Sequence, residues 1–315
     1  MKRGVNRPRC AGDYTVRFPR FDVAMRLPVA LSVLLTALSA LPLHAAEPLL
    51  PEAQGYQSRE DWRRPIAPFA LGDRSWYIGT EGLSAVLVKT DAGAVLIDGG
   101  LPQAADMLLA HMRTLGVAPS DLKLILHSHA HIDHAGPIAA IKRATGARLV
   151  TNAESAVLLQ RGGFDDLNFG DDMLFPPVNA DRIIMDGEVV ELGGTQFTAH
   201  FTPGHTPGSL SWTWTDTKAG KPLRIAYVDS LSAPGYKLVG NPRQPRVVDN
   251  YRRAFAEVRA LPCDLLLSPH PDASGWKLGE STTPTTLTCR AYADRAQAAF
   301  DKMLKEQQAA AKVAR

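Results

Sequence analysis

The sequence predicts an α/β fold of the αββα sandwich type, in which two β-sheets pack face to face and helices cover their outer faces. Short apolar or alternating runs, which are typical of strands, alternate with helical patterns, and this alternation favours a layered α/β architecture. A series of strands that leads into a helix also occurs twice, although no sequence identity between the two halves is visible. With 315 residues and 45% hydrophobic composition, the chain can bury a large core.

The first half of the predicted sandwich follows an extended, proline-rich arm at residues 47–72. The large apolar groups of this arm are Tyr56 and Trp62, which we expect to pack against the core or the surface, with the border of the active site as the alternative. Strands are predicted at residues 75–78, 85–89, 94–97, 122–126 and 148–151. Helices are predicted at residues 103–115, where His111 faces the surface, and at residues 137–145.

The second half is predicted to repeat this order. Its strands are expected at residues 182–185, 189–192, 196–201, 210–214, 223–228 and 264–267, and its helices at residues 248–261 and 289–311. Between the halves, residues 162–179 show no clear period and carry Phe164, Phe169, Met173 and Phe175. Long loops in compact domains are often functional, so this segment is interpreted as a flap near the substrate or, alternatively, as a packed loop. A subunit contact is a further alternative for Met173 or Phe175.

Four metal-binding side chains lie within the six residues His-Ala-His-Ile-Asp-His at 129–134, between a predicted buried strand and a helix. Residues two apart in an extended backbone point the same way, so the imidazoles of His129 and His131 can reach one metal ion. Asp133 and His134 follow the turn and face elsewhere. Because four ligands so close in sequence crowd around one tetrahedral ion, the spacing predicts two metal ions.

The missing ligands are expected at other strand ends, because a rigid sheet brings side chains together at one edge. His205 lies in Thr-Pro-Gly-His-Thr-Pro-Gly-Ser, and His270 lies in Ser-Pro-His-Pro; each segment follows a predicted strand. Four of the nine histidines fall between residues 127 and 134, which favours a metal cluster over ordinary loop residues. The predicted sites are two zinc ions, the first held by His129, His131 and His205 and the second by Asp133, His134 and His270.

These motifs resemble those of the metallo-β-lactamase superfamily. The resemblance rests on His-x-His-x-Asp-His and on the later Gly-His-Thr-Pro-Gly and Pro-His-Pro segments, and it extends from about Trp76 to Cys289. Asp-Ser-Leu-Ser-Ala-Pro-Gly-Tyr at residues 229–236 and Asn-Ala-Glu-Ser-Ala at residues 152–156 resemble the subclass B3 enzymes. The resemblance implies a periplasmic di-zinc hydrolase of penicillins, cephalosporins and carbapenems, with a single domain at residues 47–315.

The resemblance also implies roles for individual residues. A zinc-bound hydroxide would attack the β-lactam carbonyl without a covalent intermediate, and Asp133 would bind the second zinc and orient that hydroxide. Ser230 and Ser232 would bind the substrate carboxylate, and Tyr236 would donate to the carbonyl oxygen as charge develops. Asp98, in an Asp-x-Gly turn, is expected beneath the metal loop, where it would orient a ligand; a plain turn residue is the alternative.

Asp229 supports a rival function, because thioester hydrolases of the glyoxalase II type place a bridging aspartate after this strand. We favour Ser230 in the active site with Asp229 turned away, since the whole string at residues 229–236 resembles the B3 type. An export signal favours the same choice. Exported hydrolases of lactones or sulfate esters remain alternatives, whereas a zinc-dependent binding protein is disfavoured because none of the six ligands is missing.

Residues 1–46 are predicted to be a leader with a secretory signal peptide. Met25 and Arg26 precede an apolar stretch that ends at Ala45-Ala46, so translation is expected to start at Met25 and the mature chain near Glu47, in the periplasm. A membrane anchor is the alternative, but Pro28 and Pro42 interrupt the stretch, so no membrane association is expected after cleavage.

Charge and cysteines add two expectations about the exported chain. Seven Lys or Arg and two Asp or Glu precede Glu47. The exported chain therefore keeps 28 Lys or Arg and 30 Asp or Glu, which gives it a formal charge of −2. Nucleic acid is therefore an unexpected partner; a β-lactam is the expected one, with a monomer or a homotetramer as the assembly. Cys263 and Cys289 remain as a pair, and an oxidising compartment favours a disulfide between them over two buried thiols.

His127 departs from the pattern, because an apolar residue would suit the end of the strand. We expect its side chain to face into the sheet as a hydrogen-bonded core histidine. Competition for the first zinc is the alternative.

Overall fold

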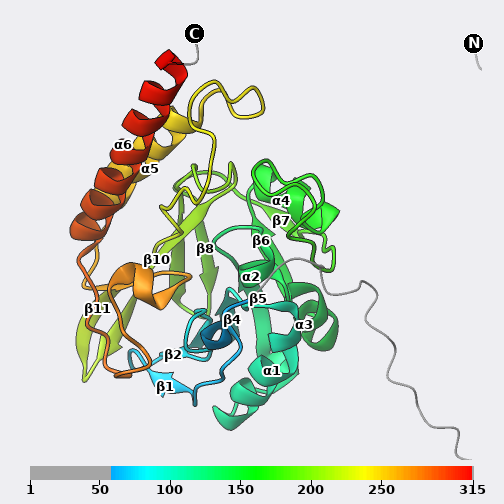
Figure 1. Cartoon of the computed structure of the whole chain (residues 1–315). Helices are drawn as coiled ribbons and strands as arrows, with labels where there is room; N and C mark the ends of the chain where they lie inside the picture. Colours follow the sequence, from blue (N-terminus) through cyan, green and yellow to red (C-terminus); the bar gives the residue numbers. More distant parts are fainter. Residues whose placement is uncertain (1–57, 314–315) are drawn as a thin grey trace, which may run out of the picture. The chain divides into compact units, whose positions relative to one another are not determined.

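Two β-sheets face each other in residues 58–313, the part of the chain that this computed structural model describes (Figure 1). The first sheet has seven strands in the order β1 (Phe69–Ala70), β2 (Ser75–Tyr77), β3 (Val86–Thr90), β4 (Gly93–Ile97), β5 (Leu122–Leu126), β6 (Arg148–Thr151) and β7 (Arg182–Ile183). The second has five, in the order β12 (Leu265–Leu267), β11 (Lys221–Tyr227), β10 (Leu210–Lys218), β9 (Thr195–Phe201) and β8 (Val189–Leu192). Strands β1 to β4 pair antiparallel and β4 to β7 parallel, whereas only the β11–β12 pair is parallel in the second sheet.

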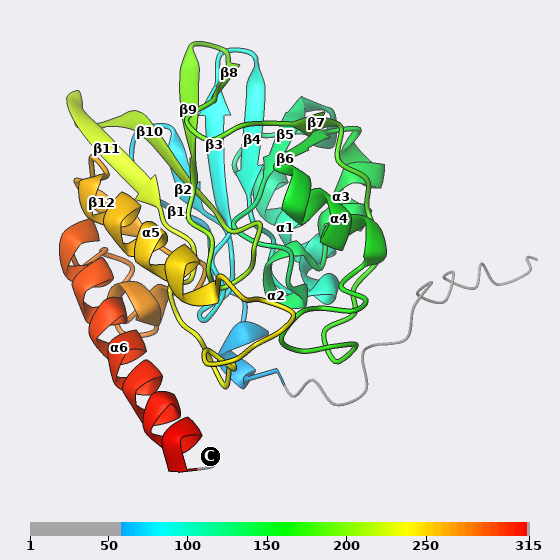
Figure 2. The ribbon, with the colours of Figure 1, turned by 90° about the horizontal axis from the view of Figure 1, so that it is seen from above.

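Helices cover the outer faces of both sheets, as Figure 2 shows. The first sheet carries α1 (Ala105–Thr114), α2 (Ile132–Ala135), α3 (Ile138–Thr145) and α4 (Ala153–Arg161), and the second carries α5 (Val247–Ala260) and α6 (Cys289–Val313). Short 3-10 helices occupy Glu60–Trp62, Pro102–Ala104, Pro119–Asp121 and Pro271–Ser274. The predicted αββα sandwich is therefore confirmed.

The period of two along each strand explains the layers. In β4, Val95 and Ile97 join the apolar cluster between the sheets, while Leu96 joins the cluster beneath α1 and α3. In β11, Tyr227 likewise packs between the sheets, and Ala226 packs against α5 and α6. Each sheet thus buries both of its faces, which is why the strands read as nearly continuous apolar runs in the sequence.

Local sequence accounts for the helix that precedes the long loop. The side chain of Asn152 accepts a hydrogen bond from the backbone N–H of Ser155 at 2.9 Å and so caps α4. The helix ends at Gly162, whose φ of 62° is a left-handed conformation that glycine adopts without steric cost. The same arrangement ends α3 at Gly146, with φ 72°.

Three expectations about the elements were wrong or incomplete. Strand β7, expected in the second sheet, pairs parallel with β6 in the first, where Val150 faces Arg182. Helix α4 was not predicted, because residues 152–156, which form its capped N-terminus, were considered only for their resemblance to the subclass B3 enzymes. The arm at residues 47–72 includes a short 3-10 helix and β1; Tyr56 and the leader at residues 1–46 lie outside the described residues.

No helix within residues 58–313 combines the length and the apolar character that crossing a membrane requires.

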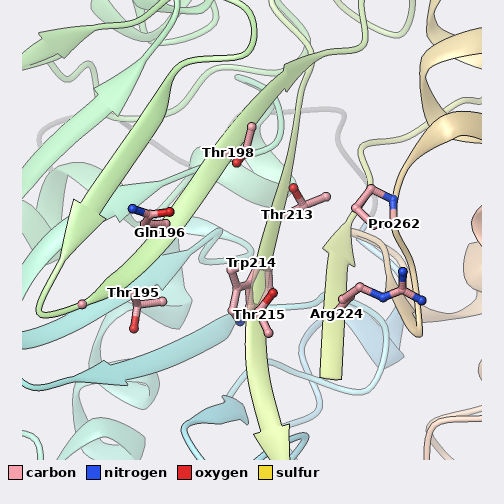
Figure 3. Close-up of a pocket in the computed structure, with 9 residues that line it drawn as sticks. Thr195, Gln196, Thr198, Thr213, Trp214, Thr215, Arg224 and Pro262 are labelled. Carbon is pink, nitrogen blue, oxygen red and sulfur yellow. The ribbon is translucent and has the colours of Figure 1, made fainter. Parts of the chain in front are cut away.

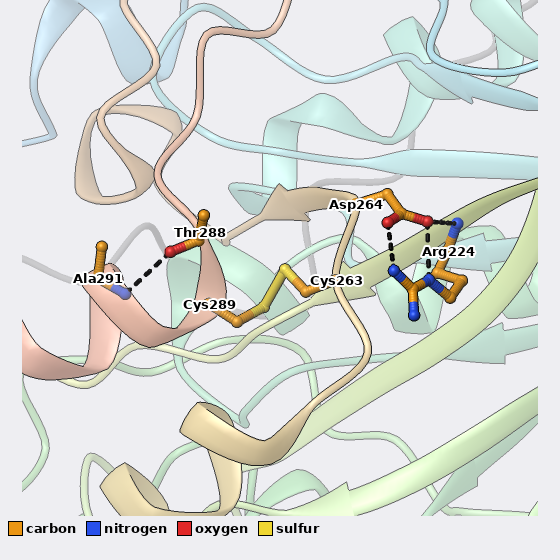
Figure 4. The surroundings of a disulfide bond; sticks show 6 residues. All are labelled: Arg224, Cys263, Asp264, Thr288, Cys289 and Ala291. Atoms are coloured by element: carbon orange, nitrogen blue, oxygen red, sulfur yellow. Dashed lines mark hydrogen bonds and ion pairs between the residues drawn. A yellow bond between two sulfur atoms is a disulfide. The ribbon is translucent and has the colours of Figure 1, made fainter.

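A disulfide joins the start of the C-terminal helix to the segment before β12, as expected (Figure 4). The Cα atoms of Cys263 and Cys289 are 6.1 Å apart, and the bridge closes a segment with a sequence separation of 26 residues. Next to it, Arg224 and Asp264 hold β11 and β12 together through hydrogen bonds of 2.8 and 2.9 Å to one carboxylate oxygen. The disulfide therefore fastens α6 to the strand that leads towards His270.

Reduction of this disulfide should lower the free energy of unfolding by roughly 3 kcal/mol, because the closed loop restricts the unfolded chain. The comparison is urea unfolding of the wild-type chain with and without reductant, beside the Cys263→Ser/Cys289→Ser variant. The variant should have the same free energy of unfolding as the reduced wild type, and the reductant should not change it. Equal stability of the oxidised and reduced wild type would contradict the expectation.

Candidate metal centre

The loop between β5 and α2 delivers most of the predicted ligands. Strand β5 ends at Leu126, His129 and His131 follow in the loop, and α2 then presents Asp133 and His134 from its first turn. All four residues are buried, with no more than 4% of any of them exposed. Their burial is unusual for charged and polar groups, which normally avoid an interior without partners.

Three histidines from two loops converge in the first group of donors. Donor atoms of His129, His131 and His205 all lie within 4.8 Å of one another, and the ring centroids are 4.5 to 5.1 Å apart. His205 arrives on the turn between β9 and β10. In that turn Gly204 has φ 153°, and a Cβ there would lie 2.8 Å from the Tyr251 ring, so only glycine allows this close approach.

Hydrogen bonds indicate which ring nitrogen each of these histidines can offer. His129 Nδ1 donates to Asp229 at 2.7 Å, His205 Nδ1 donates to the Ser232 carbonyl at 2.9 Å, and His131 Nε2 lies 3.2 Å from Asp166. The nitrogens left for a metal are Nε2 of His129, Nδ1 of His131 and Nε2 of His205. Such carboxylate and carbonyl partners are the usual support of metal-binding histidines.

The second group surrounds Asp133. Donor atoms of His129, Asp133 and His134 lie within 4.8 Å of one another, and Asp133 Oδ2 is 3.1 Å from His134 Nε2 and 3.4 Å from His270 Nε2. The rings of His134 and His270 are 4.8 Å apart. The structure therefore brings all six predicted ligands into one cluster, with His270 as its most exposed member at 21% of the side chain.

The electrostatics of the cluster favour a bound cation. Burial, aided by the neighbouring histidines, lowers the pKa of His129 and lowers that of His205 to about 3, so both imidazoles are neutral and can coordinate. Burial would raise the pKa of Asp133, but His134 and His270 hold it well below its usual range. Burial would also lower the pKa of His134, yet Asp133 raises it overall, and a metal ion can supply that positive charge in place of the proton.

Unpaired buried atoms point to the same conclusion. Within the described residues, His129 Nε2, Asp133 Oδ1 and His134 Nε2 are buried without a hydrogen-bond partner. An orphaned buried polar atom costs about 1–3 kcal/mol, so three in one place require an explanation. Three imidazoles beside a carboxylate and further histidines form a donor set that fits a divalent metal ion, zinc among them.

Asp98 lies beneath the metal loop, as expected, and holds it through Ser128. Its carboxylate accepts hydrogen bonds from the backbone N–H and the hydroxyl of Ser128, both at 2.7 Å, and from the Tyr227 hydroxyl at 2.7 Å. The His134 Nδ1 atom is 3.9 Å away. Asp98 therefore fixes the backbone next to His129 more directly than it orients a ligand.

The expected position of Asp229 was wrong. Its side chain is fully buried, and its Oδ1 atom accepts the hydrogen bond from His129 described above, so the carboxylate faces the metal loop instead of turning away. The only sequence signal for a role of Asp229 near the site was its position at the end of a strand. The sequence could not show that its carboxylate contacts a histidine 100 residues earlier.

The three residues with predicted substrate contacts differ in their surroundings. The Tyr236 side chain is buried, and its hydroxyl donates to the His205 backbone carbonyl at 3.0 Å. This hydrogen bond uses the proton that the expected contact with substrate would need. Ser230 is buried and Ser232 is exposed. The backbone carbonyl of Ser232 accepts hydrogen bonds from His205 and from Tyr251, a contribution that no sequence pattern indicates.

His127 faces the interior, fully buried, with Nε2 2.6 Å from the Thr151 hydroxyl oxygen. Burial lowers its pKa to about 4, so the ring is neutral near pH 7. Nδ1 has no partner among residues 58–313, so the ring is only half satisfied. His111, expected at the surface, is partly buried and contacts the Ile78 carbonyl at 2.8 Å.

Aromatic residues border the cluster on two sides. The Phe169 ring, on the predicted flap at residues 162–179, lies 5.2 Å from the His131 ring, and the Trp62 ring lies 5.1 Å from the His270 ring. Trp62 thus borders the candidate site, which was the alternative to packing against the core or the surface. Met173 and Phe175 are buried in the core beneath the helices, which leaves neither available for a subunit contact.

A polar hollow of about 360 Å³ on the second sheet contains none of the predicted site residues (Figure 3). Thr198 and Thr213 point into it from β9 and β10, and Arg224 borders it from β11. Its lining offers no imidazole, thiol or carboxylate as a metal donor. The histidine cluster is therefore the stronger candidate for chemistry.

Comparison with known proteins agrees with this centre. A family profile described as the metallo-β-lactamase superfamily matches residues 78–219. An N-acyl homoserine lactonase of Bacillus cereus is 24% identical over 159 residues, which cover 42% of this chain and 58% of that protein. A hydroxyacylglutathione hydrolase of Anaeromyxobacter dehalogenans is 34% identical over 128 residues, or 41% and 40% of the two chains. The chain thus spans about half the length of these curated relatives.

Solved structures match over much more of their length. The subclass B3 metallo-β-lactamase BJP-1 of Bradyrhizobium japonicum is 36% identical with a TM-score of 0.73, covering 80% of this chain and 98% of that one. MEM-A1, a subclass B3 enzyme from a soil metagenome, is 39% identical with a TM-score of 0.73, covering 79% and 99%. A Cronobacter sakazakii metallo-β-lactamase, also at a TM-score of 0.73, is 38% identical over 79% and 98% of the two chains and is described by a HARLDQ motif, where this chain has HAHIDH. The chain belongs to the metallo-β-lactamase superfamily of metal-dependent hydrolases and, within it, to subclass B3.

Proposed function

We propose that this chain is a di-zinc β-lactamase that hydrolyses the amide of penicillins, cephalosporins and carbapenems and so confers antibiotic resistance. The observation that carries the proposal is the convergence of all six predicted ligands in a chain that is similar to subclass B3 structures over nearly their whole length. His129, His131 and His205 would hold one zinc, and Asp133, His134 and His270 the other.

Bound zinc would supply a water acidic enough to act as a nucleophile near neutral pH, together with positive charge for the nitrogen that leaves. The residues of the chain prepare the site for this chemistry. Asp133 is ionised, and its Oδ1 atom is free among the described residues, so it can hold a metal and accept a hydrogen bond from water. No serine nucleophile and no covalent intermediate are required.

Substrate recognition would use the rim of the cluster. Phe169 and Trp62 offer apolar surface on its two sides, and Ser230 and Ser232 would bind the substrate carboxylate. Tyr236 acts instead on the protein, because its hydroxyl is already engaged with the backbone of His205.

Hydrolysis of thioesters or lactones is the second candidate, and the similarity to the lactonase and the hydroxyacylglutathione hydrolase favours it. Two observations weigh against it. The matching segments cover no more than 58% of those relatives, and Asp229, the residue that such an activity would use as a bridge, is bound to His129 Nδ1.

The location and assembly follow from the sequence alone and belong to the proposal. The signal peptide within residues 1–46 would export the chain to the periplasm, where it would act as a monomer or homotetramer without a nucleic-acid partner and, after signal cleavage, without a membrane. The disulfide between Cys263 and Cys289 supports an oxidising compartment.

The proposal is tested by carbapenem hydrolysis with the purified chain from Glu47 onward. Turnover should disappear after chelation and dialysis and return when zinc is added, because both the nucleophile and the leaving group depend on the metal. A sample that contains two zinc equivalents but does not hydrolyse any β-lactam would contradict the proposal. Homoserine lactones and glutathione thioesters are the substrates to assay beside it.

Replacement of His127 by Leu should leave the zinc content unchanged, because this imidazole points at Thr151 and not into the cluster. It should lower the free energy of unfolding by about 1–3 kcal/mol, since the buried Thr151 hydroxyl loses its partner. His129→Leu is the matched variant and should lose one zinc equivalent on dialysis. Loss of zinc from His127→Leu, measured by atomic emission, would show that His127 is a ligand.

Replacement of Tyr236 by Phe should change kcat by less than about tenfold, whereas loss of a donor to a developing oxyanion costs on the order of 10²–10³. Phe keeps the ring stacked 5.7 Å from the His205 ring. Tyr251→Phe is the matched variant, because Tyr251 also donates to a backbone carbonyl beside the site. A hundredfold fall in kcat for Tyr236→Phe alone would restore the role predicted from the sequence.

A further inference from the structure

The long loop at residues 162–179 places a carboxylate beside His131, one of the predicted metal ligands. Asp166 is 96% buried, and its Oδ2 atom lies 3.2 Å from Nε2 of His131. The sequence drew attention to the aromatic residues of this loop but not to Asp166.

The two carboxylate oxygens of Asp166 have separate partners. Oδ1 accepts hydrogen bonds from the backbone N–H groups of Asn168 at 2.8 Å and Phe169 at 2.9 Å. Oδ2 is therefore the atom that meets His131. The turn holds one oxygen fixed, so the direction of the other is fixed as well.

A second loop holds this turn in place. The Arg243 guanidinium donates to the side chain of Asp165 at 2.6 Å and to its backbone carbonyl at 3.2 Å. The Gln244 amide donates to the Asn168 side chain at 3.0 Å. Contacts on both sides of Asp166 thus attach its loop to the segment before α5.

A neutral imidazole carries one proton, so its two nitrogens cannot both donate. When Nε2–H of His131 donates to Asp166, the lone pair of Nδ1 is available on the side where His129 and His205 converge. We propose that Asp166 is a positioning residue that fixes this tautomer of His131, and that the loop at residues 162–179 thereby sets the affinity of the first metal site. The inference rests on the metal sites of the proposed function but does not depend on the substrate.

Asp166→Asn tests this role because the two side chains have the same shape. The Asn oxygen can still accept the N–H groups of Asn168 and Phe169, so the turn persists, but the amide NH₂ then faces His131. An NH₂ donor favours the lone pair on Nε2 and the proton on Nδ1, which opposes coordination by Nδ1. Zinc affinity, measured by competition with a chromophoric chelator, should fall about tenfold to hundredfold for one of the two ions.

Asp172→Asn is the matched control, because Asp172 is an exposed carboxylate of the same loop whose side chain does not contact His131. It should bind both ions as the wild type does, while thermal unfolding of the metal-free Asp166→Asn variant should stay close to that of the wild type. Wild-type zinc affinity in Asp166→Asn would overturn the inference.

The zinc-loaded wild type offers a measurement that needs no variant. ¹⁵N NMR of its histidines should show His131 protonated at Nε2 and metal-bound at Nδ1. The opposite tautomer would overturn the inference even if Asp166→Asn failed to fold. Neither measurement involves hydrolysis, so these results stand if the chain proves to cleave a substrate other than a β-lactam.

Discussion

The whole arrangement depends on holding several imidazoles in one buried space. Protonated histidines this close would repel one another, and burial already disfavours their charged forms. The chain meets this constraint by giving each histidine of the first group one fixed acceptor: Asp229 for His129, the Ser232 carbonyl for His205 and Asp166 for His131. The remaining nitrogens are thereby directed towards a common point before any metal binds.

The sandwich explains why the residues of the cluster come from distant segments of the chain. The first sheet supplies residues 129–134 after β5, whereas the second supplies His205 between β9 and β10 and His270 after β12. Two hydrogen bonds from β10 hold the loop after β5 in place. Trp212 Nε1 donates to the His127 carbonyl at 2.9 Å, and the Leu210 N–H donates to the Ser128 carbonyl at 2.7 Å. The packing between the sheets is therefore what sets the distances within the cluster.

The layers, and the six residues that the structure brings into one cluster, could be predicted from the sequence because both depend on local signals. Apolar runs that end in a histidine can be read directly, and so can the spacing of His129 and His131. The orienting groups could not be predicted, because Asp166 and Asp229 act through pairs separated by 35 and 100 residues. Strand β7 was misplaced for the same reason: a two-residue strand carries almost no pattern, and the free edge of β6 determines its partner.

The two groups of donors are not equivalent. In the first, every histidine has a fixed acceptor, and the most exposed, His205, is 7% accessible. In the second, His134 Nδ1 lies 3.9 Å from Asp98, and His270 is more exposed, with its ring beside Trp62 and its Nε2 atom 3.4 Å from Asp133, which is itself a predicted ligand. A preorganised group holds a metal with little rearrangement, while an open one leaves room for a reacting molecule. The support around each histidine therefore divides the centre into a buried anchor and an accessible face, and that accessible face lies on the side of His270.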